Sequence, residues 1–310
     1  MNETAPRVWL IDSHAQIFRA WHVWPPALRD ADGEVCNALH GFADFLLELL
    51  ESLARSENGP LHLACAFDSP GSRRYRQSIY PAYKAHRPPP PAELTPQFER
   101  CRALALAAGI PIFAAPEHEA DDVIGTLCAR LRARGHALTL LTGDKDLAQL
   151  IRENDRWWNP LRREVLDQAG VKRAFGVRPE QIPDLLALTG DSSDNIPGVP
   201  GIGPRTAARL LEKHGDIDQL YAFLERVGMM REGVAGRGAT RTQRLLAEHA
   251  DTVRLARRLT GVVCDLPLAE DRVRLQPTDS AAFDAQLRQL RVDATRRRRW
   301  ASVLDELGAR

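Results

Sequence analysis

Acidic side chains in this sequence gather where predicted strands end, and the densest group is Glu119, Asp121 and Asp122. Carboxylates this close together repel one another unless a cation holds them. Taken alone, the group is typical of a solvated first helical turn, because the helix dipole favours acidic residues there. The alternative is a cation site, and the other acidic residues of the chain decide between the two interpretations.

The elements that would position these carboxylates alternate between strands and helices. Buried strands are predicted from the apolar runs at 8–11, 61–67, 111–114 and 137–141, with edge strands at 156–158 and 165–166. Helical periodicity between the buried runs predicts an α/β fold with a mainly parallel sheet and helices on both faces. Sites in such sheets lie beyond the carboxyl ends of the strands. Acidic residues occupy that edge after each buried strand: Asp12, Asp68, Glu119, Asp121, Asp122, Asp144 and Asp146.

Two further carboxylates, Asp191 and Asp194, follow a predicted helix at 179–189. A cluster of carboxylates without a cysteine or histidine ligand set points to a hard divalent cation, Mg²⁺ or Mn²⁺, rather than to zinc. Two such ions roughly 3.5 to 4 Å apart stabilise the attacking and leaving oxygens of an in-line phosphoryl displacement, with water as the nucleophile. The acidic residues therefore predict metal-assisted phosphoryl transfer.

The long connection at 69–92 is rich in arginine and tyrosine, and such a connection within a compact domain is usually functional or disordered. Basic side chains neutralise phosphates, and aromatic rings stack on unpaired bases. Gly201-Ile202-Gly203, before a predicted helix at 204–214, presents backbone N–H groups that suit a phosphate, although glycines alone favour a tight turn between helices. Together with the acidic cluster, these features predict a polynucleotide hydrolase.

Composition is that of an ordinary globular protein, with 44% hydrophobic and 27% charged residues among 310 and a net charge of +1. No apolar run approaches the roughly 20 residues that span a bilayer and no signal peptide is recognisable, so we expect a cytoplasmic protein without a membrane partner. The scattered cysteines are predicted to be reduced, mostly core thiols. No Gly-x-Gly-x-x-Gly or Walker loop follows a strand, which argues against a dinucleotide or nucleoside triphosphate ligand.

Several segments resemble, in order, the signature segments of the bacterial 5′ nuclease family. This family comprises the 5′ to 3′ exonuclease domain of DNA polymerase I, its stand-alone and phage relatives, and the more distant flap endonucleases. The matching segments cover nearly the whole chain and are Leu10–His14, Ala66–Asp68, Tyr83–Pro89, Glu119–Asp122, Leu141–Asp146, Leu188–Asn195 and Pro197–Gly203. The resemblance implies a PIN-like 5′ nuclease fold with a helical arch and a C-terminal helical region that contains a helix-hairpin-helix.

The domain organisation that we predict has two parts. A nuclease core occupies 1–178, with the arch at about 70–95. A helical DNA-binding region follows at 179–310, with the helix-hairpin-helix at about 185–214 and a break in the later helices near 264–271.

The resemblance implies a divalent-metal-dependent 5′ to 3′ exonuclease and flap endonuclease that hydrolyses phosphodiesters in branched or nicked DNA with two Mg²⁺ or Mn²⁺ ions. By the family pattern, Asp122 lies close to the first ion, whose other neighbours are Asp12, Asp68, Glu119 and Asp121. The second ion is surrounded by Asp144, Asp146, Asp191 and Asp194. The residues expected to act in catalysis are Lys84 and Arg87, through the scissile phosphate, and Asp122.

The resemblance also implies where DNA and a potassium ion bind. The arch receives a 5′ single strand, with Tyr83 stacking on a base, and the helix-hairpin-helix grips the downstream duplex. The residues expected at DNA are Phe18, Arg19, Arg76, Tyr83, Lys84, Arg87, Gly201, Gly203 and Arg205. The potassium ion is expected on the main-chain carbonyls of Leu188, Thr189, Pro197, Val199 and Ile202.

Three features depart from the family pattern. Ser13 follows the first aspartate in place of glycine, Tyr75-Arg76 replaces Phe-Arg, and the chain ends at Arg310 without a polymerase. We therefore expect a stand-alone nuclease, and the complete set of second-site carboxylates favours an active enzyme over one that has lost activity. A module that binds branched DNA without cutting it and a ribonuclease stay open as alternatives, as do RNA primer strands as substrates. A monomer associated with the nucleoid is expected.

Overall fold

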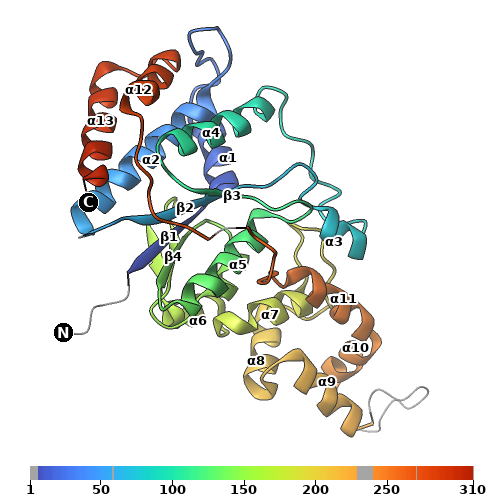
Figure 1. The fold of residues 1–310 in the computed structure, drawn as a ribbon. Coiled ribbons are helices and arrows are strands. Elements are labelled where there is room, and N and C mark those ends of the chain that lie inside the picture. The colour runs from blue at the N-terminus through green and yellow to red at the C-terminus, as the bar shows by residue number, and fades with distance from the viewer. Residues whose placement is uncertain (1–5, 58, 229–239, 270, 310) are drawn as a thin grey trace, which may run out of the picture.

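A computed structural model describes residues 6–57, 59–228, 240–269 and 271–309, and its centre is a six-stranded sheet in the order β3-β2-β1-β4-β5-β6 (Figure 1). The strands are β1 (Arg7–Asp12), β2 (His62–Ala66), β3 (Ile112–Phe113), β4 (Ala137–Leu141), β5 (Arg156–Asn159) and β6 (Glu164–Leu166). Every neighbouring pair is parallel except β5 with β6. The prediction of a mainly parallel sheet is confirmed.

Two apolar cores lie on opposite faces of the sheet. Val8 and Leu10 of β1 belong to one core, and Trp9 and Ile11 to the other, because successive strand side chains point to opposite faces. The face of Trp9 is covered by α1 (Ser13–Val23), α2 (Asn37–Ser56), α4 (Thr95–Ala107), α12 (Ser280–Gln289) and α13 (Ala294–Gly308). The face of Val8 is covered by α5 (Ala120–Ala133), α6 (Gln168–Phe175), α7 (Ile182–Thr189) and α11 (Ala250–Thr260).

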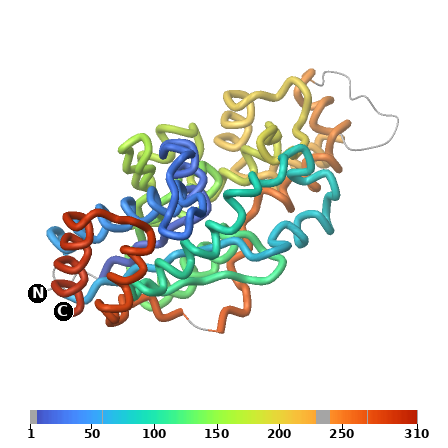
Figure 2. The backbone as a smooth tube through the Cα atoms, turned by 90° about the horizontal axis from the view of Figure 1, so that it is seen from above, coloured from blue at the N-terminus to red at the C-terminus, as the bar shows by residue number. Residues whose placement is uncertain are grey.

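The helices after β6 divide between two ends of the molecule. α8 (Pro204–His214), α9 (Ile217–Arg226) and α10 (Arg241–Glu248) extend beyond the sheet beside α7 and α11 (Figure 1). The last two helices return to α2, where Arg299 forms an ion pair of 2.7 Å with Glu51 (Figure 2). The region predicted as one helical unit at 179–310 is thus divided in space, and its boundary at 178 stays a prediction.

The connection at 261–279 carries the chain from α11 back to α12, and its described residues form no helix. It runs beside the start of β2, where the Leu63 N–H donates to the Val273 carbonyl at 2.7 Å and the Leu275 N–H donates to the Leu61 carbonyl at 2.9 Å. The predicted break near 264–271 lies inside this connection, which is longer than expected.

The connection between β2 and α4 contains one short helix, α3 (Arg74–Ile79), which lies beside α11 (Figure 1). A turn follows at 81–87, and this segment, predicted as the arch, is folded onto the start of α5 by contacts described below. The name arch segment is used here for residues 70–95.

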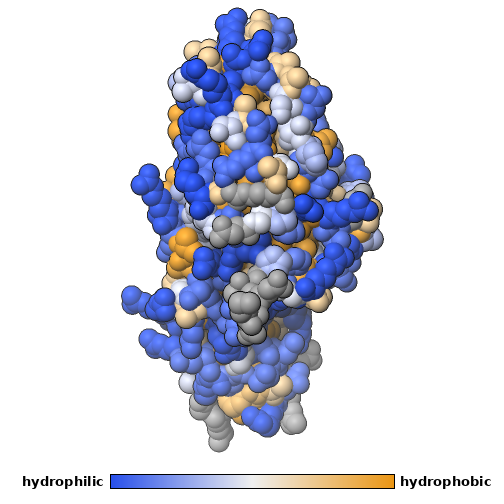
Figure 3. All heavy atoms as spheres, turned by 60° about the vertical axis from the view of Figure 1, so that its left-hand side comes forward, coloured by the Kyte–Doolittle hydropathy of each residue, from blue (hydrophilic) through white to orange (hydrophobic). Residues whose placement is uncertain are grey.

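The surface is mainly polar. The face in Figure 3 is predominantly hydrophilic, with apolar side chains scattered in small groups. Among the helices that the structure describes, none combines the length and the apolar character needed to cross a bilayer. All five cysteines are free, and all are buried as predicted except Cys264, which is exposed.

Candidate active site

The acidic residues predicted at strand ends meet at one edge of the sheet. Asp12 ends β1, which lies between β2 and β4. Asp68 follows β2 and Asp144 follows β4, so these two carboxylates flank Asp12. The Ala120 N–H donates to Asp68 Oδ1 at 2.7 Å, which joins the first turn of α5, and with it Asp121, to the same edge.

Hydrogen bonds from the chain orient the central carboxylates. Asp12 caps α1 by accepting from the Ala15 N–H at 3.2 Å, and its other oxygen accepts from the Thr142 hydroxyl at 2.8 Å. The Asp144 N–H donates back to that hydroxyl at 2.9 Å, and Asp144 Oδ1 accepts from the Asp146 N–H at 2.8 Å. The loop after β4 therefore holds its two carboxylates beside Asp12.

The carboxylates at this edge carry more negative charge than the neighbouring basic side chains neutralise. Burial raises the pKa of Asp12 to about 6, and the charges of Asp144 and Asp68 add to the effect. Burial and then Asp144 raise the pKa of Asp121 and of Asp146 well above the usual value for aspartate. Asp146 Oδ1 is also buried without a hydrogen-bond partner in the described part of the chain. Lys84 near Asp121 and Lys145 near Asp146 oppose these shifts but do not outweigh them.

Basic residues of the arch segment reach two neighbouring carboxylates. Lys84 Nζ lies 2.7 Å from Glu119 Oε1 and 3.4 Å from Asp194 Oδ2, and Arg87 Nη2 lies 2.6 Å from Asp194 Oδ1. Burial alone would raise the pKa of Glu119, but the positive charges around it, led by Lys84, outweigh burial and lower it. The structure therefore brings the predicted catalytic residues Lys84 and Arg87 to the acidic edge.

The turn after α7 brings the remaining predicted carboxylate, Asp191, to the same edge. Asp191 Oδ2 lies 2.9 Å from Lys145 Nζ, and Asp191 Oδ1 accepts from the hydroxyl and N–H of Ser193 at 2.7 and 2.8 Å. Burial opposes ionisation of Asp191, yet Lys145 and Ser193 lower its pKa overall. Lys145 is thus a basic residue of the site that the sequence prediction did not include, although it stands between Asp144 and Asp146.

Asp122 differs from the other acidic residues because the chain itself saturates its carboxylate. Arg76 donates to both oxygens at 2.7 and 2.8 Å, and the N–H groups of Val263 and Glu119 donate at 2.9 and 3.3 Å. The side chain is fully buried. In this structure Asp122 has no free acceptor site, so its predicted direct metal contact and catalytic role are not supported; it orders the start of α5 instead.

Arg76 was predicted to contact DNA, and the structure corrects this expectation. Its guanidinium is buried and also donates to the carbonyls of Leu259 at 3.0 Å and Gly261 at 3.2 Å. Arg76 therefore joins α3, the start of α5 and the end of α11. The sequence signal for part of this arrangement is the spacing Glu119-x-x-Asp122, which resembles a capping box at a helix start.

Tyr83 is also buried rather than free to stack on a base. The residue is 2% exposed, and its hydroxyl donates to Glu119 Oε2 at 2.7 Å. The next residue, Lys84, has a φ of 50°, a left-handed conformation that non-glycine residues rarely adopt and that costs about 1 to 3 kcal/mol. Its N–H donates to the Asp194 carbonyl at 2.9 Å. Backbone strain at Lys84 accompanies the placement of its ammonium group beside Glu119.

The predicted helix-hairpin-helix consists of α7, a glycine-rich turn and α8. A Cβ on Gly198 would lie 2.2 Å from the Thr189 carbonyl carbon, so the turn requires glycine there. The Leu188 carbonyl accepts from the Val199 N–H at 2.9 Å, and the Val199 carbonyl accepts from the Ile202 N–H at 3.0 Å. Each of these carbonyls keeps one lone pair. The potassium ligands, which include Pro197, stay a prediction.

The remaining residues predicted at DNA are accessible. Gly201, Gly203 and Arg205 are exposed at the start of α8, and no other atom lies within 4 Å of a Cβ built on Gly203. Phe18 on α1 is 37% exposed, and Arg19 beside it is half-buried. Their contact with DNA stays a prediction.

Family models match the chain along most of its length. Residues 7–176 match the 5′-3′ exonuclease N-terminal resolvase-like domain, and residues 177–282 match the 5′-3′ exonuclease C-terminal SAM fold. The chain belongs to the 5′-3′ exonuclease family. The predicted family membership is therefore confirmed.

Named relatives agree with this assignment. DNA polymerase I of Rhizobium leguminosarum is 39% identical over 266 residues, which are 85% of this chain and 25% of that protein. DNA polymerase I of Chloroflexus aurantiacus is 38% identical over 92% of this chain and 29% of that protein. The chain thus spans less than a third of these relatives. A 5′-3′ exonuclease of Aquifex aeolicus is 38% identical over 71% of this chain and 73% of its own length.

Solved structures share the fold at low sequence identity. T5 5′-exonuclease with bound divalent metal ions (zinc) has a TM-score of 0.62 and 17% identity, over 97% of this chain and 99% of that chain. Flap endonuclease-1 from Methanococcus jannaschii has a TM-score of 0.62 and 14% identity, over 99% and 94%. The catalytic core of Rad2 in complex with DNA substrate has a TM-score of 0.59 and 13% identity, over 98% and 93%. The predicted 5′ nuclease fold is confirmed.

Proposed function

We propose that the chain is a divalent-metal-dependent 5′ to 3′ exonuclease and flap endonuclease that hydrolyses phosphodiesters in branched or nicked DNA. The observation that carries this proposal is the uncompensated negative charge at the sheet edge, where Asp12, Asp121 and Asp146 have raised pKa values and Asp146 Oδ1 lacks a partner in the described chain. Oxygen ligands of this kind suit Mg²⁺ or Mn²⁺. Two solved structures of similar fold support the proposal: T5 5′-exonuclease with bound divalent metal ions, and a T5 flap endonuclease in complex with DNA and metal ions.

Two ions fit the acidic edge by the chemistry of its donors. The first would be held by Asp12, Asp68, Glu119 and Asp121, and the second by Asp144, Asp146, Asp191 and Asp194. Within the described residues no three acidic, histidine or cysteine side chains are already arranged around one point, so ligation requires side-chain rotation. When bound, the ions supply an acidified water and charge stabilisation at the leaving oxygen.

The chain supplies the groups that position the phosphate. Glu119 holds Lys84 and Asp194 holds Arg87 at this edge, where both cationic groups would face a phosphodiester bound against the carboxylates. Arginine can bind two phosphate oxygens at once, whereas lysine acts as a compact charge. The basic residues thereby orient the scissile group against the carboxylate edge.

Duplex DNA is proposed to lie on the exposed hairpin at Gly201, Gly203 and Arg205, with a potassium ion on the neighbouring carbonyls. Gly198→Ala tests the hairpin, because the added methyl group would collide with the Thr189 backbone. We expect weaker binding of duplex arms with cleavage of a bound flap retained. Gly308→Ala, whose added Cβ meets no other atom within 4 Å, is the control and should leave DNA binding unchanged.

A labelled 5′ flap substrate tests the main proposal. With Mg²⁺ we expect a cut near the junction, and with chelator we expect none. A flap that stays intact with both Mg²⁺ and Mn²⁺ at high enzyme concentration, yet is bound, would overturn cleavage in favour of a binding module. Preferential cutting of an all-RNA strand would favour a ribonuclease. A flap substrate of the same sequence with an RNA primer at its 5′ end would test whether the protein removes primers.

Two further properties complete the proposal. We infer that the protein acts as a monomer, which sedimentation at several concentrations tests. We also propose that it works in the cytoplasm at the nucleoid, and imaging of a fluorescent fusion together with a DNA stain tests that location.

A further inference from the structure

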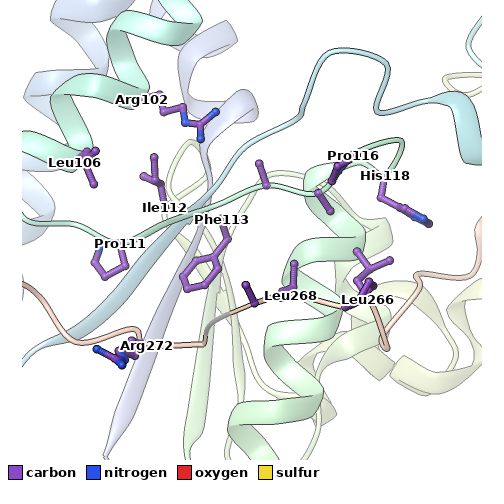
Figure 4. Close-up of a pocket in the computed structure, with 14 residues that line it drawn as sticks. Arg102, Leu106, Pro111, Ile112, Phe113, Pro116, His118, Leu266, Leu268 and Arg272 are labelled. Atoms are coloured by element: carbon purple, nitrogen blue, oxygen red, sulfur yellow. The ribbon is translucent and has the colours of Figure 1, made fainter.

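Two cavities in the described part of the chain differ in their walls. One, of about 760 Å³, lies between β3, α4 and the connection at 261–279, and its walls are mainly apolar side chains such as Phe113 and Leu268 (Figure 4). The other, of about 490 Å³, lies beside the loop after β4 and also has polar and charged walls. We call it the β5–β6 pocket, and it is defined by Trp157, Asn159, Arg162, Glu164, Leu166 and Phe175.

One face of the β5–β6 hairpin forms a wall of this pocket. Asn159 pairs with Glu164 across the hairpin, and Trp157 pairs with Leu166. Directly opposed residues of an antiparallel pair have their side chains on one face, with Cβ atoms about 4.5 to 5.5 Å apart, and residues two apart on a strand share that face. The wall therefore has a polar pair of side chains beside an apolar pair.

The polar pair has an unused donor and an unused acceptor. Asn159 is 4% exposed, and its Oδ1 accepts from the N–H groups of Leu161 and Arg162 at 3.0 and 3.2 Å, which distinguishes the amide oxygen from the nitrogen. No partner of Asn159 Nδ2 or of the Glu164 carboxylate occurs among the described residues. A buried donor without a partner costs free energy, so a ligand that accepts from Nδ2 would be stabilised there.

The pocket adjoins the acidic edge. Asp144 and Lys145 line it, and the indole N–H of Trp157 donates to the Asp144 carbonyl at 3.0 Å. Arg162, in the turn of the hairpin, is exposed and forms no ion pair with another described residue. A nucleotide whose phosphate lies at the acidic edge or on Arg162 would have its base beside Asn159. The pocket volume is within the range of about 300 to 1,000 Å³ that small-molecule sites have.

We propose that the β5–β6 pocket binds a guanine base. This inference rests on the proposed function, because the base would belong to a nucleotide of the DNA strand at the acidic edge. Asn159 Nδ2 would donate to guanine O6, and Glu164 would accept from N1–H and the 2-amino group. Phe175 and Leu166 would contact the faces of the base, as apolar and aromatic side chains do where enzymes bind unpaired bases.

The order of donors and acceptors selects guanine among the four bases. Its Watson–Crick edge has one acceptor followed by two donors, which matches an amide N–H beside a carboxylate. Adenine and cytosine present a ring nitrogen acceptor to the carboxylate, and thymine offers it a single donor. A guanine in this pocket would change how fast a strand is cut and not the place of the cut.

The probe is 2′-deoxyguanosine 5′-monophosphate (dGMP), titrated into the full chain with Mg²⁺ and followed by calorimetry. It contains no phosphodiester bond, so binding is measured without turnover. We expect saturable binding, with the adenine, cytosine and thymine nucleotides about tenfold weaker or more. The hypoxanthine nucleotide lacks the 2-amino group and should also bind about tenfold more weakly, because Glu164 then accepts one hydrogen bond fewer.

Matched variants locate the base. Glu164→Gln should bind dGMP about tenfold more weakly and should bind the guanine and hypoxanthine nucleotides about equally. Glu153→Gln, at an exposed position before β5, is the control and should behave like the unmodified chain. Asn159→Asp keeps the oxygen that accepts from the turn and loses the donor, so it should also weaken dGMP binding. Glu164→Gln, on a half-exposed edge position, should keep its thermal unfolding profile and tests the pocket even if Asn159→Asp does not fold.

Flap substrates that differ only at the nucleotides flanking the cut separate two sources of the base. If the base belongs to the strand, single-turnover cleavage should be faster with guanine than with hypoxanthine at one of these positions. Glu164→Gln should remove that difference. Equal rates together with selective dGMP binding would overturn the strand as the source and assign the pocket to a free guanine nucleotide.

Three outcomes would overturn the inference: no saturable binding of dGMP, equal binding of all four nucleotides, or unchanged binding in Glu164→Gln. A chain that cuts flaps and does not bind dGMP would refute this inference alone. A chain that binds dGMP selectively and leaves every flap intact would refute the nuclease proposal alone.

Discussion

Arg76 and Asp122 form a buried bidentate ion pair, with nitrogen to oxygen distances of 2.7 and 2.8 Å. The residues are separated by 46 positions in the sequence, and their contact fixes the arch segment to the first turn of α5. Removal of either partner leaves a buried charge without its counterion. Breaking such pairs costs about 3 to 5 kcal/mol.

Arg76→Ala should therefore lower the free energy of unfolding by about that amount, measured by urea denaturation at neutral pH. Arg254→Ala is the control, because its ion pair with Asp251 lies between exposed side chains and should contribute little. Replacement of both Arg76 and Asp122 by apolar residues should destabilise less than Arg76→Ala alone. A loss no larger than that of the control would contradict the buried-pair interpretation.

Asp146→Asn should stabilise the metal-free protein, because burial and Asp144 disfavour the ionised form of Asp146. Mg²⁺ should stabilise the unmodified chain, by about 2.7 kcal/mol at one hundred times the dissociation constant, and should stabilise the variant less. Thermal unfolding with Mg²⁺ and with chelator measures both effects. Asp305→Asn, at an exposed position, is the control, and an Mg²⁺ response identical in all three proteins would remove Asp146 from the ion site.

Lys84→Ala should lower the single-turnover cleavage rate about 10²- to 10³-fold, the loss typical of removing one group that stabilises developing charge. Binding of the duplex should change little, because the side chain is buried beside Glu119 rather than displayed on the surface. Fluorescence anisotropy under chelator separates binding from chemistry. Lys172→Ala, at an exposed site on α6, should leave both unchanged. Parallel loss of rate and affinity would instead make Lys84 a binding residue.

Acid should destabilise the protein through histidines whose pKa burial lowers, chiefly His40. Burial lowers the pKa of His40, and the charges of Arg296 and Arg100 act in the same direction, although the Leu290 carbonyl opposes them. The unfolded chain then binds the proton first, so stability falls as pH drops below the unfolded value of about 6.5, by at most about 1.4 kcal/mol per pH unit for one histidine. Burial also lowers the pKa of His62, with the same sign.

His40→Gln should reduce this slope, measured by urea denaturation between neutral and mildly acidic pH. His22→Gln, at an exposed position on α1, should not change it. A slope that is the same in His40→Gln and in the unmodified chain would exclude His40 as a source of the acid sensitivity.

The sheet and its acidic edge were predictable because both depend on short-range patterns. Apolar runs define the strands, and a parallel sheet brings the residues that end or follow its strands, such as Asp12 and Asp144, to one edge whatever the other side chains are. The binding partner of Asp122 was not predictable from the sequence. An acidic residue at a helix start can bind a metal ion, water or an arginine equally well. Only the folded position of Arg76 decides between them.

Other features depend on packing between distant parts of the chain. The return of α12 and α13 to α2 rests on contacts such as Arg299 with Glu51, 248 positions apart. The left-handed backbone at Lys84 has no local signature, because its N–H bond to Asp194 forms only when the turn after α7 docks there. The periodicity of apolar residues along the sequence does not predict tertiary contacts of this kind.

The attachment of Arg76 to the carbonyls of Leu259 and Gly261 makes α3, α5 and α11 parts of one rigid joint. For the function proposed here, the segment that receives a single strand and the helices beside the duplex-binding hairpin share that joint. The contacts of Arg76 would then keep the distance between a bound duplex and the carboxylates constant. If the proposed function holds, the position of the cut along a strand would be set by the dimensions of the protein rather than by the base sequence.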